Sequence, residues 1–466
     1  MKLTLNKIAE YTGGKVYGDG NSVVTHAAID SRKADNNSLF VALKGENTDG
    51  HNYVGNAFKS GAIAAMVKKG CFDIQDDNNY IEVEDSAKAM GEIATGIIKD
   101  RGNSLIKLAI TGSVGKTSTK DMIAFVFSKY FNTLKSELNH NNELGLPLTV
   151  MKLEDEHKVI VTEMGMRGLG QIEYLTNIVK PNIAVITNIG IAHMELLGSR
   201  ENILRAKLEI CKGMNPDATL VLNGDNDMLS QESKVREIVA EYGVVCPKIV
   251  YFGTEGNSDY IAEKIHGSKY SLLTPDGKEY QINLKVPGVH NVYNSMAAVC
   301  AARAANISVE EAISALNEFG DDVSRQKIIN TSWGVLIDDT YNAGPESMEA
   351  SLSVLKEIKA DVKIAALGDM LELGQMTEEA HRKVGKIASV SADVLVAVGA
   401  SSVLYYDEFS GERKLHVSDS ASGAKETVEL IKNYIKCGKS VAVLTKGSNA
   451  MKMNVITDAL IHNGGL

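Results

Sequence analysis

The chain has 466 residues, of which 44% are hydrophobic and only seven are proline, a composition typical of an α/β protein with about two to four domains. Its formal net charge of −10 argues against general nucleic-acid binding, which depends on a basic surface, so any phosphate binding must be local. The first ten residues contain no continuous apolar segment, and no later run reaches the roughly 18 apolar residues of a membrane span. We therefore expect a cytoplasmic enzyme without membrane insertion.

The five cysteines are odd in number, lie far apart and show no C-x-x-C spacing. This pattern predicts reduced, mostly buried thiols rather than disulfide bonds or a zinc site.

Residues 1–103 mix short strand candidates with small helices. The segment Ser31-Arg32 precedes an apolar strand candidate, and Asp49 and His51 follow it. Polar groups on loops that flank a strand could bind an anionic sugar nucleotide, with Arg32 on a phosphate and Ser31 beside it. The alternative for Ser31 and Arg32 is an ordinary solvated turn, which is the commoner use of such residues.

Residues 104–322 show apolar strands that alternate with helices, the pattern of a parallel sheet. A hairpin around Pro275-Asp276-Gly277 follows within residues 270–285, and helices over 291–306 and 309–319 close this part. The predicted parallel strands are 105–111, 159–163, 183–188 and 219–223.

The first of these strands leads into Gly112-Ser113-Val114-Gly115-Lys116-Thr117-Ser118 and then a helix. Backbone N–H groups and the helix start can cradle a phosphate there, with Lys116 at the outer phosphates and the Thr117 hydroxyl on Mg²⁺. The pattern G-x-x-G-K-T is shorter than the usual phosphate loop, because Ile110 stands where the first glycine belongs. An ordinary glycine turn with an exposed lysine is the alternative.

Three further side chains of this part are candidates for a metal site. Glu163 ends a strand and can reach a metal ion held by Thr117, although a strand-end glutamate is often a surface residue. His193 follows another strand, and Lys207 lies on the next helix. Taken alone, His193 is more often structural and Lys207 a solvated residue.

Asn291 and Asn294 lie three residues apart at a helix start. Their amides could bind a nucleotide base or simply cap the helix, and capping is the commoner use.

Residues 323–466 predict a second open α/β domain, in which ligands sit beyond the carboxyl ends of the strands. At one such end, Asp339 could bind ribose hydroxyls and Tyr341 could stack on adenine, with Asn342 on the same turn. The predicted strands are 334–338, 362–367, 394–398 and 440–444.

The motifs occur together in one order along the chain. They are Gly112-x-x-Gly-Lys116-Thr-Ser118, Thr-Glu163-Met-Gly, Ala-His193 followed by Lys207, Gly-x-His290-Asn291-x-x-Asn294, Ser-Arg325, and Asp338-Asp-x-Tyr-Asn342. As an ordered set they resemble the Mur ligase family, ATP-dependent amide-forming enzymes of peptidoglycan synthesis.

The resemblance implies an α/β fold of three domains. A small α/β N-terminal domain (1–103) would bind a UDP-sugar peptide. A central P-loop NTPase-like domain (104–322), with a mostly parallel sheet and helices on both faces, would bind ATP. A C-terminal Rossmann-like domain (323–466) would contribute to binding of ATP and D-alanyl-D-alanine.

The resemblance also implies residue roles. Lys116 and Thr117 would serve the phosphates and Mg²⁺, Glu163 a first metal ion, and His193 with a carbamylated Lys207 a second one. The remaining roles are Asn291 and Asn294 near adenine, Arg325 near the γ-phosphate, Asp339 and Tyr341 around the nucleoside, and Lys446 near the incoming dipeptide or the phosphate.

The segments 339–348 and 367–374 favour the branch of the family that joins D-alanyl-D-alanine to a UDP-N-acetylmuramoyl tripeptide, and we expect a monomer. Two alternatives stay open: a sister ligase that adds another amino acid, and a P-loop ATPase or nucleotide-binding module without ligase activity. The sequence does not distinguish lysine from diaminopimelate as the third peptide residue.

Overall fold

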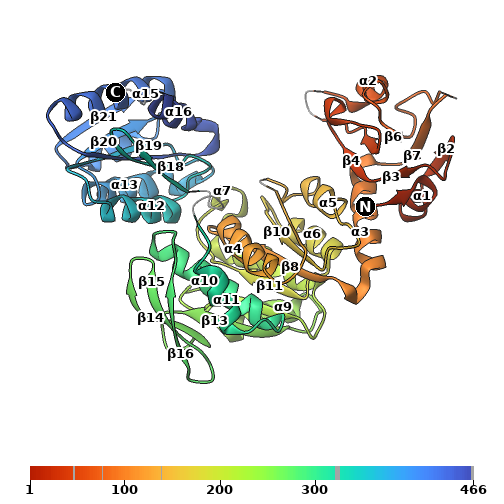
Figure 1. Cartoon of the computed structure of the whole chain (residues 1–466), viewed down its shortest axis with the longest axis horizontal. Coiled ribbons are helices and arrows are strands. Elements are labelled where there is room, and N and C mark those ends of the chain that lie inside the picture. The colour runs from red at the N-terminus through yellow and green to blue at the C-terminus, as the bar shows by residue number, and fades with distance from the viewer. Residues whose placement is uncertain (46–47, 76, 138, 321–325, 463–466) are drawn as a thin grey trace.

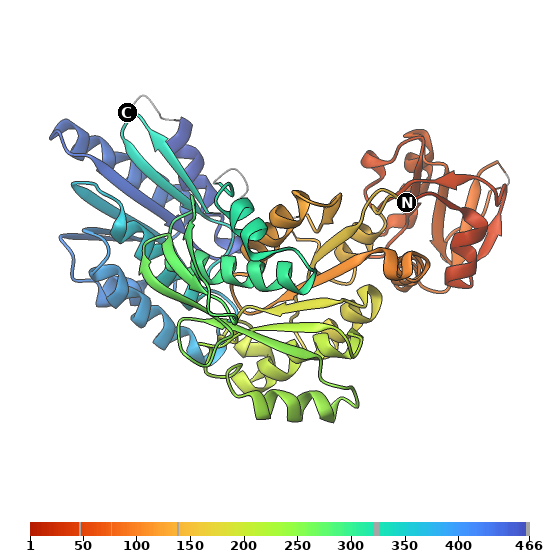
Figure 2. The same ribbon diagram turned by 60° about the horizontal axis from the view of Figure 1, so that its bottom comes forward.

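The computed structural model describes residues 1–45, 48–75, 77–137, 139–320 and 326–462. The chain forms three α/β domains, and the N-terminal and C-terminal domains lie at opposite ends of the central one (Figure 1). A second view shows the same arrangement (Figure 2). This confirms the predicted fold class. The predicted limit at 103/104 falls in a short turn before the central sheet, and the limit at 322/323 lies outside the described residues.

The N-terminal domain is built on a mixed sheet of order β2-β7-β6-β5-β4, with a separate ribbon β1-β3. Strands β4 to β7 pair in parallel, and β2 pairs antiparallel to β7. The elements are β1 (Leu3–Thr4), α1 (Leu5–Thr12), β2 (Lys15–Tyr17), β3 (Val23–Val24), β4 (His26–Ala28), β5 (Ser38–Val41), α2 (Val54–Lys59), β6 (Ala64–Lys68), β7 (Asn79–Val83) and α3 (Ser86–Arg101).

The central sheet has the order β16-β15-β14-β13-β12-β11-β8-β10-β9 and is parallel from β9 to β14. Its strands are β8 (Ile106–Thr111), β9 (Thr133–Lys135), β10 (Val159–Glu163), β11 (Ile183–Ile186), β12 (Thr219–Asn223), β13 (Lys248–Gly253), β14 (Tyr260–His266), β15 (Lys269–Leu273) and β16 (Glu279–Asn283). Its helices are α4 (Lys116–Ser128), α5 (Gly145–Val150), α6 (Gln171–Val179), α7 (Met194–Leu197), α8 (Arg200–Leu208), α9 (Glu232–Glu241), α10 (Val289–Ala304) and α11 (Val309–Leu316).

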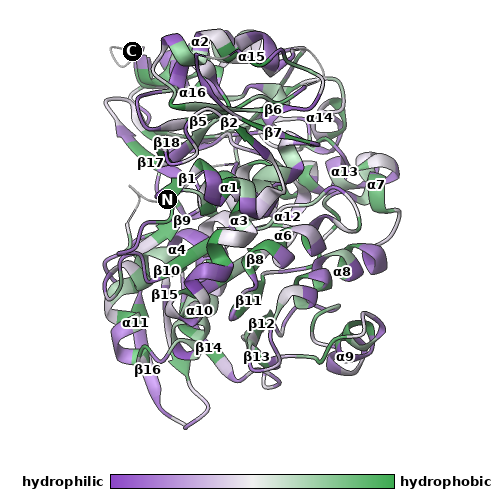
Figure 3. Cartoon of the chain, turned by 90° about the vertical axis from the view of Figure 1, so that its right-hand side faces the viewer, coloured by the Kyte–Doolittle hydropathy of each residue, from purple (hydrophilic) through white to green (hydrophobic). Residues whose placement is uncertain are grey.

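Both faces of the central sheet are covered, as its sequence predicts. Successive residues of a strand point to opposite faces, so in β8 the side chains of Leu108 and Ile110 join the core under α4 and α10. Ala109 joins the core under α5, α6 and α8. Buried strands of this kind, such as β8 and β11, are therefore almost continuously hydrophobic (Figure 3).

The C-terminal sheet has the order β17-β18-β22-β19-β20-β21. All its pairs are parallel except β17 with β18. The sequence predicted the four inner strands but neither edge strand. The elements are β17 (Lys327–Thr331), β18 (Gly334–Asp339), α12 (Pro345–Glu357), β19 (Val362–Gly368), α13 (Thr377–Ser389), β20 (Val394–Val398), α14 (Val403–Glu408), β21 (Arg413–Val417), α15 (Ser420–Lys436), β22 (Val441–Lys446) and α16 (Asn454–His462).

Helix α3 joins the N-terminal domain to the central one. Its buried residues Met90, Ile93 and Ile97 belong to one apolar core that extends from the N-terminal sheet into the central domain. The helix also carries Gly91, where a Cβ would overlap the hydroxyl of Tyr174 on α6. These two domains therefore share a continuous core, whereas the C-terminal domain has its own clusters on the two faces of its sheet.

The cysteines form no disulfide, as predicted. Cys211 and Cys300 are buried, but Cys71 and Cys437 are exposed, so the prediction of burial is wrong for these two. Both lie in turns, Cys71 after β6 and Cys437 after α15, where no sheet or helix covers them. Across the part of the chain that the structure describes, no helix is both long and apolar enough to cross a membrane.

Candidate active site

The phosphate loop lies between β8 and α4 at the carboxyl end of the central sheet. Gly112 and Gly115 have φ values of 150° and 82°, a region that favours glycine, and a Cβ at Gly112 would overlap the Thr187 hydroxyl. The end of β11 holds the loop in place, because the N–H groups of Ser113 and Val114 donate to the Asn188 carbonyl and side-chain oxygens at 3.0 and 2.9 Å. Helix α4 begins at Lys116 and directs its N-terminus at the loop, where backbone N–H groups and the helix dipole favour an anion.

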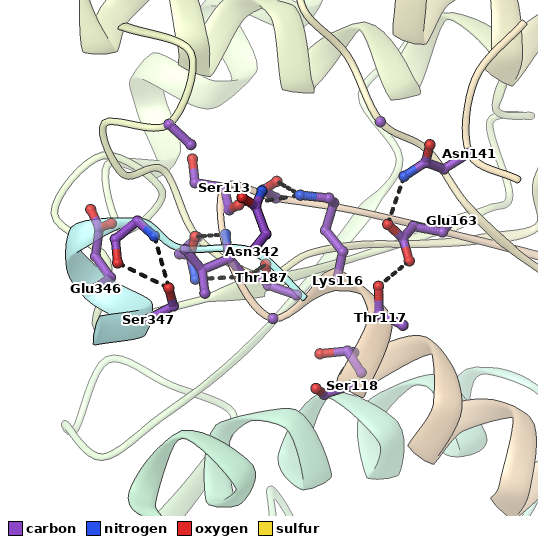
Figure 4. Close-up of a pocket in the computed structure, with 18 of the residues that line it drawn as sticks. Ser113, Lys116, Thr117, Ser118, Asn141, Glu163, Thr187, Asn342, Glu346 and Ser347 are labelled. Carbon is purple, nitrogen blue, oxygen red and sulfur yellow. Dashed lines mark hydrogen bonds between the residues drawn. The ribbon is translucent and has the colours of Figure 1, made fainter. Parts of the chain in front are cut away.

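Lys116 folds back over this loop, as Figure 4 shows. Its ammonium donates to the carbonyl oxygens of Gly112 and Ser113 at 2.9 and 3.2 Å. A bound phosphate oxygen would compete with these two carbonyl oxygens for the ammonium, since a phosphate is the stronger acceptor.

Thr117 and Glu163 meet beside the loop, as the sequence predicted. The Thr117 hydroxyl donates to Glu163 Oε2, and Asn141 Nδ2 donates to Oε1 at 2.9 Å (Figure 4). Glu163 is almost fully buried. A buried carboxylate and a hydroxyl at one point are oxygen ligands of the type that Mg²⁺ prefers.

No cluster of three or more His, Cys, Asp or Glu side chains that could hold a metal ion occurs among the described residues. The Thr117 hydroxyl and the Glu163 carboxylate alone fit a metal that takes most of its ligands from phosphates and water, which is the usual state of Mg²⁺ in nucleotide sites. The residues present therefore fit the predicted ion only as part of a nucleotide complex.

His193 and Lys207 lie on the wall of the same cavity. Lys207 is 1% exposed, and burial together with the charge of Lys116 holds the pKa of its amine well below the usual value. Burial and the charges of Lys207 and Lys116 also lower the pKa of His193. Both side chains are thus biased towards their neutral forms, in which a nitrogen lone pair is free to react or to bind a metal.

The two asparagines of α10 are used differently. Asn294 lines the cavity, and its amide accepts from the Thr119 hydroxyl at 2.9 Å and donates to Asn291 Oδ1 at 3.1 Å. Asn291 is not among the lining residues and donates to the Pro287 carbonyl at 2.7 Å. The structure therefore brings Asn294 to the predicted nucleotide site and places Asn291 behind it.

The C-terminal domain supplies the opposite wall. Lys446 is 2% exposed, and its ammonium lies 2.7 Å from Asp339 Oδ2 and donates to the Asn342 carbonyl at 3.0 Å. Tyr341 donates its hydroxyl to Asn139 of the central domain. Asp339 and Lys446 thus brace the turn that carries Tyr341 and Asn342 into the cavity, and all four line it.

His290 faces this pair from the start of α10. Burial lowers the pKa of its imidazole to about 4, the Asp339 carboxylate opposes that shift, and the Lys446 charge adds to it. The imidazole is therefore neutral at physiological pH and can lie beside the Lys446 ammonium.

The walls enclose a cavity of about 1130 Å³ between the central and C-terminal domains. A cavity of this size has room for a nucleotide with part of a second substrate. The groups predicted from motifs far apart in the sequence therefore face one space.

The predicted sugar-nucleotide residues do not line this cavity. Arg32 is highly exposed and pairs with Asp30 at 2.8 Å. Asp49 lies 2.6 Å from Nδ1 of His51, whose Nε2 accepts from the Lys68 N–H at 3.0 Å. These contacts stay within the N-terminal domain, where Ser31 is also buried, and Arg325 lies outside the described residues.

Several residues that shape the site carry no motif that would assign them a role from the sequence. Thr187 and Asn188 hold the phosphate loop, Asn141 holds Glu163, and Glu346 of α12 accepts from the Ile191 N–H at 3.3 Å. Thr187 and Asn188 are the last two residues of the predicted strand 183–188, and a position at the carboxyl end of a strand is the signal that could have identified them.

Three segments of the chain match models of one protein family. Residues 23–97 match the Mur ligase family catalytic domain, residues 110–302 the Mur ligase middle domain, and residues 324–449 the Mur ligase glutamate ligase domain. The chain belongs to the Mur ligase family.

Named relatives match over the whole chain. The UDP-N-acetylmuramoyl-tripeptide–D-alanyl-D-alanine ligase of Bacillus subtilis (strain 168) is 33% identical over 469 residues, covering 99% of both chains. The Haemophilus influenzae protein of the same name is 33% identical over 475 residues, covering 99% of this chain and 98% of its own. Among solved structures, MurF from Acinetobacter baumannii superposes with a TM-score of 0.89 at 30% identity, covering 99% of both chains. MurF from Thermotoga maritima in complex with ADP gives 0.80 at 25% identity, covering 95% of this chain and 98% of its own.

Proposed function

We propose that this chain is an ATP-dependent ligase that joins D-alanyl-D-alanine to UDP-N-acetylmuramoyl tripeptide and so makes the pentapeptide precursor of peptidoglycan. Relatives that carry this activity in their names match the chain over its full length, which bears out the function predicted from the sequence.

One observation carries the proposal beyond simple ATP hydrolysis. Lys207 is buried in the wall of the cavity that the phosphate loop also lines, and burial with the charge of Lys116 lowers the pKa of its amine. The parts that recur in phosphate-loop ATPases are a loop lysine and a hydroxyl and an acid on Mg²⁺, and a buried, neutral lysine is not among them. Such an amine can combine with carbon dioxide, and the resulting carbamate offers the oxygen anion that a hard metal ion needs.

We assign the metal roles as the sequence predicted them. Thr117 and Glu163 would hold one Mg²⁺, and His193 with carbamylated Lys207 a second. When bound, the ions would neutralise charge on the transferring phosphate.

The chemistry follows from the weakness of a carboxylate as an acyl donor. The terminal carboxylate of the tripeptide attacks the γ-phosphorus of ATP, an O–P bond forms, and ADP leaves. Lys116 moves from its loop carbonyls to the phosphate oxygens and stabilises their charge. The deprotonated amine of D-alanyl-D-alanine then attacks the acyl carbon, an amide bond forms, and phosphate leaves with one carboxylate oxygen.

The other predicted residues would bind the substrates. Asn294 would lie near adenine with Asn291 supporting it, and Arg325 near the γ-phosphate. Asp339 and Tyr341 would lie around the nucleoside, and Lys446 near the incoming dipeptide or the phosphate. Ser31, Arg32, Asp49 and His51 would bind the UDP sugar.

We further propose the domain limits 1–103, 104–322 and 323–466, a monomeric state and a cytoplasmic location. A matched pair of substrates, with lysine or diaminopimelate as the third peptide residue, would identify the natural tripeptide by the ratio of kcat/KM.

The test is phosphate release with ATP, Mg²⁺, the UDP-N-acetylmuramoyl tripeptide and D-alanyl-D-alanine, each omitted in turn. We expect release only when all four are present, together with a product larger than the tripeptide by one dipeptide. Release without the dipeptide would identify an ATPase. Turnover with a single amino acid but not with the dipeptide would identify a sister ligase.

A further inference from the structure

The loop between β19 and α13 of the C-terminal domain reaches across to the central domain. It contains Glu372, whose φ of 63° is unusual for a residue other than glycine, and Gly374 at 53°. A Cβ at Gly374 would lie 3.0 Å from the Cβ of Glu195 on α7, so the loop backbone packs directly on that helix. The short helix α7 begins immediately after His193.

The same loop is firmly held within its own domain. The N–H of Met370 donates to His381 Nε2 at 3.1 Å, and the N–H of Leu371 donates to Ser448 Oγ at 2.9 Å. His381 and Leu373 are buried. The loop is therefore a fixed part of the C-terminal domain.

Glu372 points its carboxylate at the imidazole of His193. Its Oε2 lies 3.0 Å from Nδ1, while its Oε1 lies 4.0 Å from the guanidinium of Arg167. Nδ1 is buried, and no hydrogen bond of good geometry reaches it from the described residues. A buried ring nitrogen without a hydrogen bond is costly, and the carboxylate within reach supplies the acceptor that it lacks.

This contact is a poor candidate for a stabilising ion pair, because the Glu372 side chain is 46% exposed and exposed pairs contribute little. Its consequence is geometric. In metal-binding histidines, a carboxylate on one ring nitrogen fixes the tautomer and orients the other nitrogen towards the metal, and its loss typically costs about 10–100-fold in affinity or activity.

We propose that Glu372 is a positioning residue of the ligase reaction: when the C-terminal domain docks, its carboxylate holds the proton on Nδ1 of His193 and leaves Nε2 for the nucleotide site. The inference rests on the proposed function, which assigns His193 to that site. It makes docking of the C-terminal domain and completion of the reaction centre a single event.

The direct test observes His193 in the ligand-free protein. Protein labelled with ¹⁵N-histidine is studied by long-range ¹H–¹⁵N correlation, and the His193 signals are identified by their loss in His193→Gln. We expect the Nδ1–H tautomer in the wild type and a shift towards Nε2–H in Glu372→Ala. Glu372→Gln keeps an amide oxygen as acceptor and should retain most of the wild-type tautomer.

The matched control is Glu349→Ala, which removes a carboxylate of similar exposure on α12 that pairs with Lys383 at 3.1 Å. It should leave both the tautomer and turnover unchanged. An unchanged tautomer in Glu372→Ala would overturn the proposal.

Turnover supplies the second readout. We expect Glu372→Ala to lower kcat about 10–100-fold with little change in KM for ATP. The same substitution added to His193→Ala should cost nothing further, since Glu372 acts through that imidazole. A full additional loss in the double variant would contradict the proposal. Because the tautomer is measured without substrates, failure of the ligase assay for the wild type would count against the proposed function instead.

Discussion

The N-terminal and C-terminal domains are attached to the central domain in different ways. The N-terminal domain shares an apolar core with it through α3, whereas the C-terminal domain has separate cores and meets it through contacts such as Tyr341 with Asn139 and Glu372 with His193. Buried apolar area holds one interface, and a small number of mostly polar contacts hold the other. Ile191 of the central domain packs against one of the C-terminal cores.

The difference explains where the chemistry lies. The cavity with the phosphate loop, Glu163 and Lys207 is closed by the domain with the weaker attachment. That domain can separate from its neighbour without exposing a large core, so substrates can enter and water can then be excluded from the acyl phosphate.

The largest effect should follow from removing the buried cation of the C-terminal domain. Lys446→Met leaves the Asp339 carboxylate without its 2.7 Å partner, which should destabilise this domain by about 3–5 kcal/mol. Fluorescence of Trp333, the single tryptophan, reports unfolding of this domain, because Trp333 is buried in one of its cores.

Asp339→Asn combined with Lys446→Met should recover part of that loss. Unfolding of the N-terminal and central domains is monitored by circular dichroism. An equally large loss of unfolding free energy in that transition would contradict the separation of the cores.

A cavity created in the core that the N-terminal and central domains share should destabilise those two domains. Ile93→Ala empties a fully buried position on α3 and should cost about 2–5 kcal/mol. The Trp333 transition should stay at the wild-type denaturant concentration while the circular dichroism transition shifts. Gly55→Ala is the control, since this position on α2 has nothing within 4 Å of a new Cβ. Coincident shifts of both probes would mean that the cores are coupled.

Low pH should weaken the interface between the central and C-terminal domains. Burial lowers the pKa of His290 to about 4 from the usual 6.5, so the unfolded state takes up the proton first as the pH falls. The His290 contribution to stability is complete above pH 6.5 and is lost between pH 6.5 and about 4, by at most about 3 kcal/mol.

His290→Gln should show a flatter dependence of the unfolding free energy over that range. An identical slope in the variant and the wild type would exclude His290 as the titrating group.

The smallest effect on stability should come from a cross-domain hydrogen bond. Tyr341→Phe removes the hydroxyl that donates to Asn139 and should cost only about 0.5–1.5 kcal/mol. Small-angle scattering should nevertheless show a more open average shape. A large loss of stability with no change in shape would mean that this contact supports folding rather than docking.

Local patterns allowed much of the fold to be predicted from the sequence. Buried inner strands such as β10 and β20 are continuous apolar runs and were identified within a residue or two. The edge strands β17 and β21 were missed, because half-exposed strands such as Lys327–Thr331 show no clear alternation of apolar and polar residues.

The residues of the candidate site also divide into those that could be predicted from the sequence and those that could not. Groups that belong to a local motif, such as Lys116 and Thr117, could be predicted because the loop and helix that place them are continuous in sequence. Contacts between residues far apart in the sequence could not be predicted. The pair Asp339 and Lys446 depends on the register of β18 with β22, and Glu372 reaches His193 only through the relative position of two domains.

The fate of a single oxygen atom tests the central claim most directly. If the tripeptide carboxylate is labelled with ¹⁸O and the enzyme turns over with ATP and D-alanyl-D-alanine, the account predicts that each phosphate released carries one ¹⁸O atom from the carboxylate. Phosphate that carries its new oxygen from water instead would contradict transfer of the γ-phosphate to the peptide.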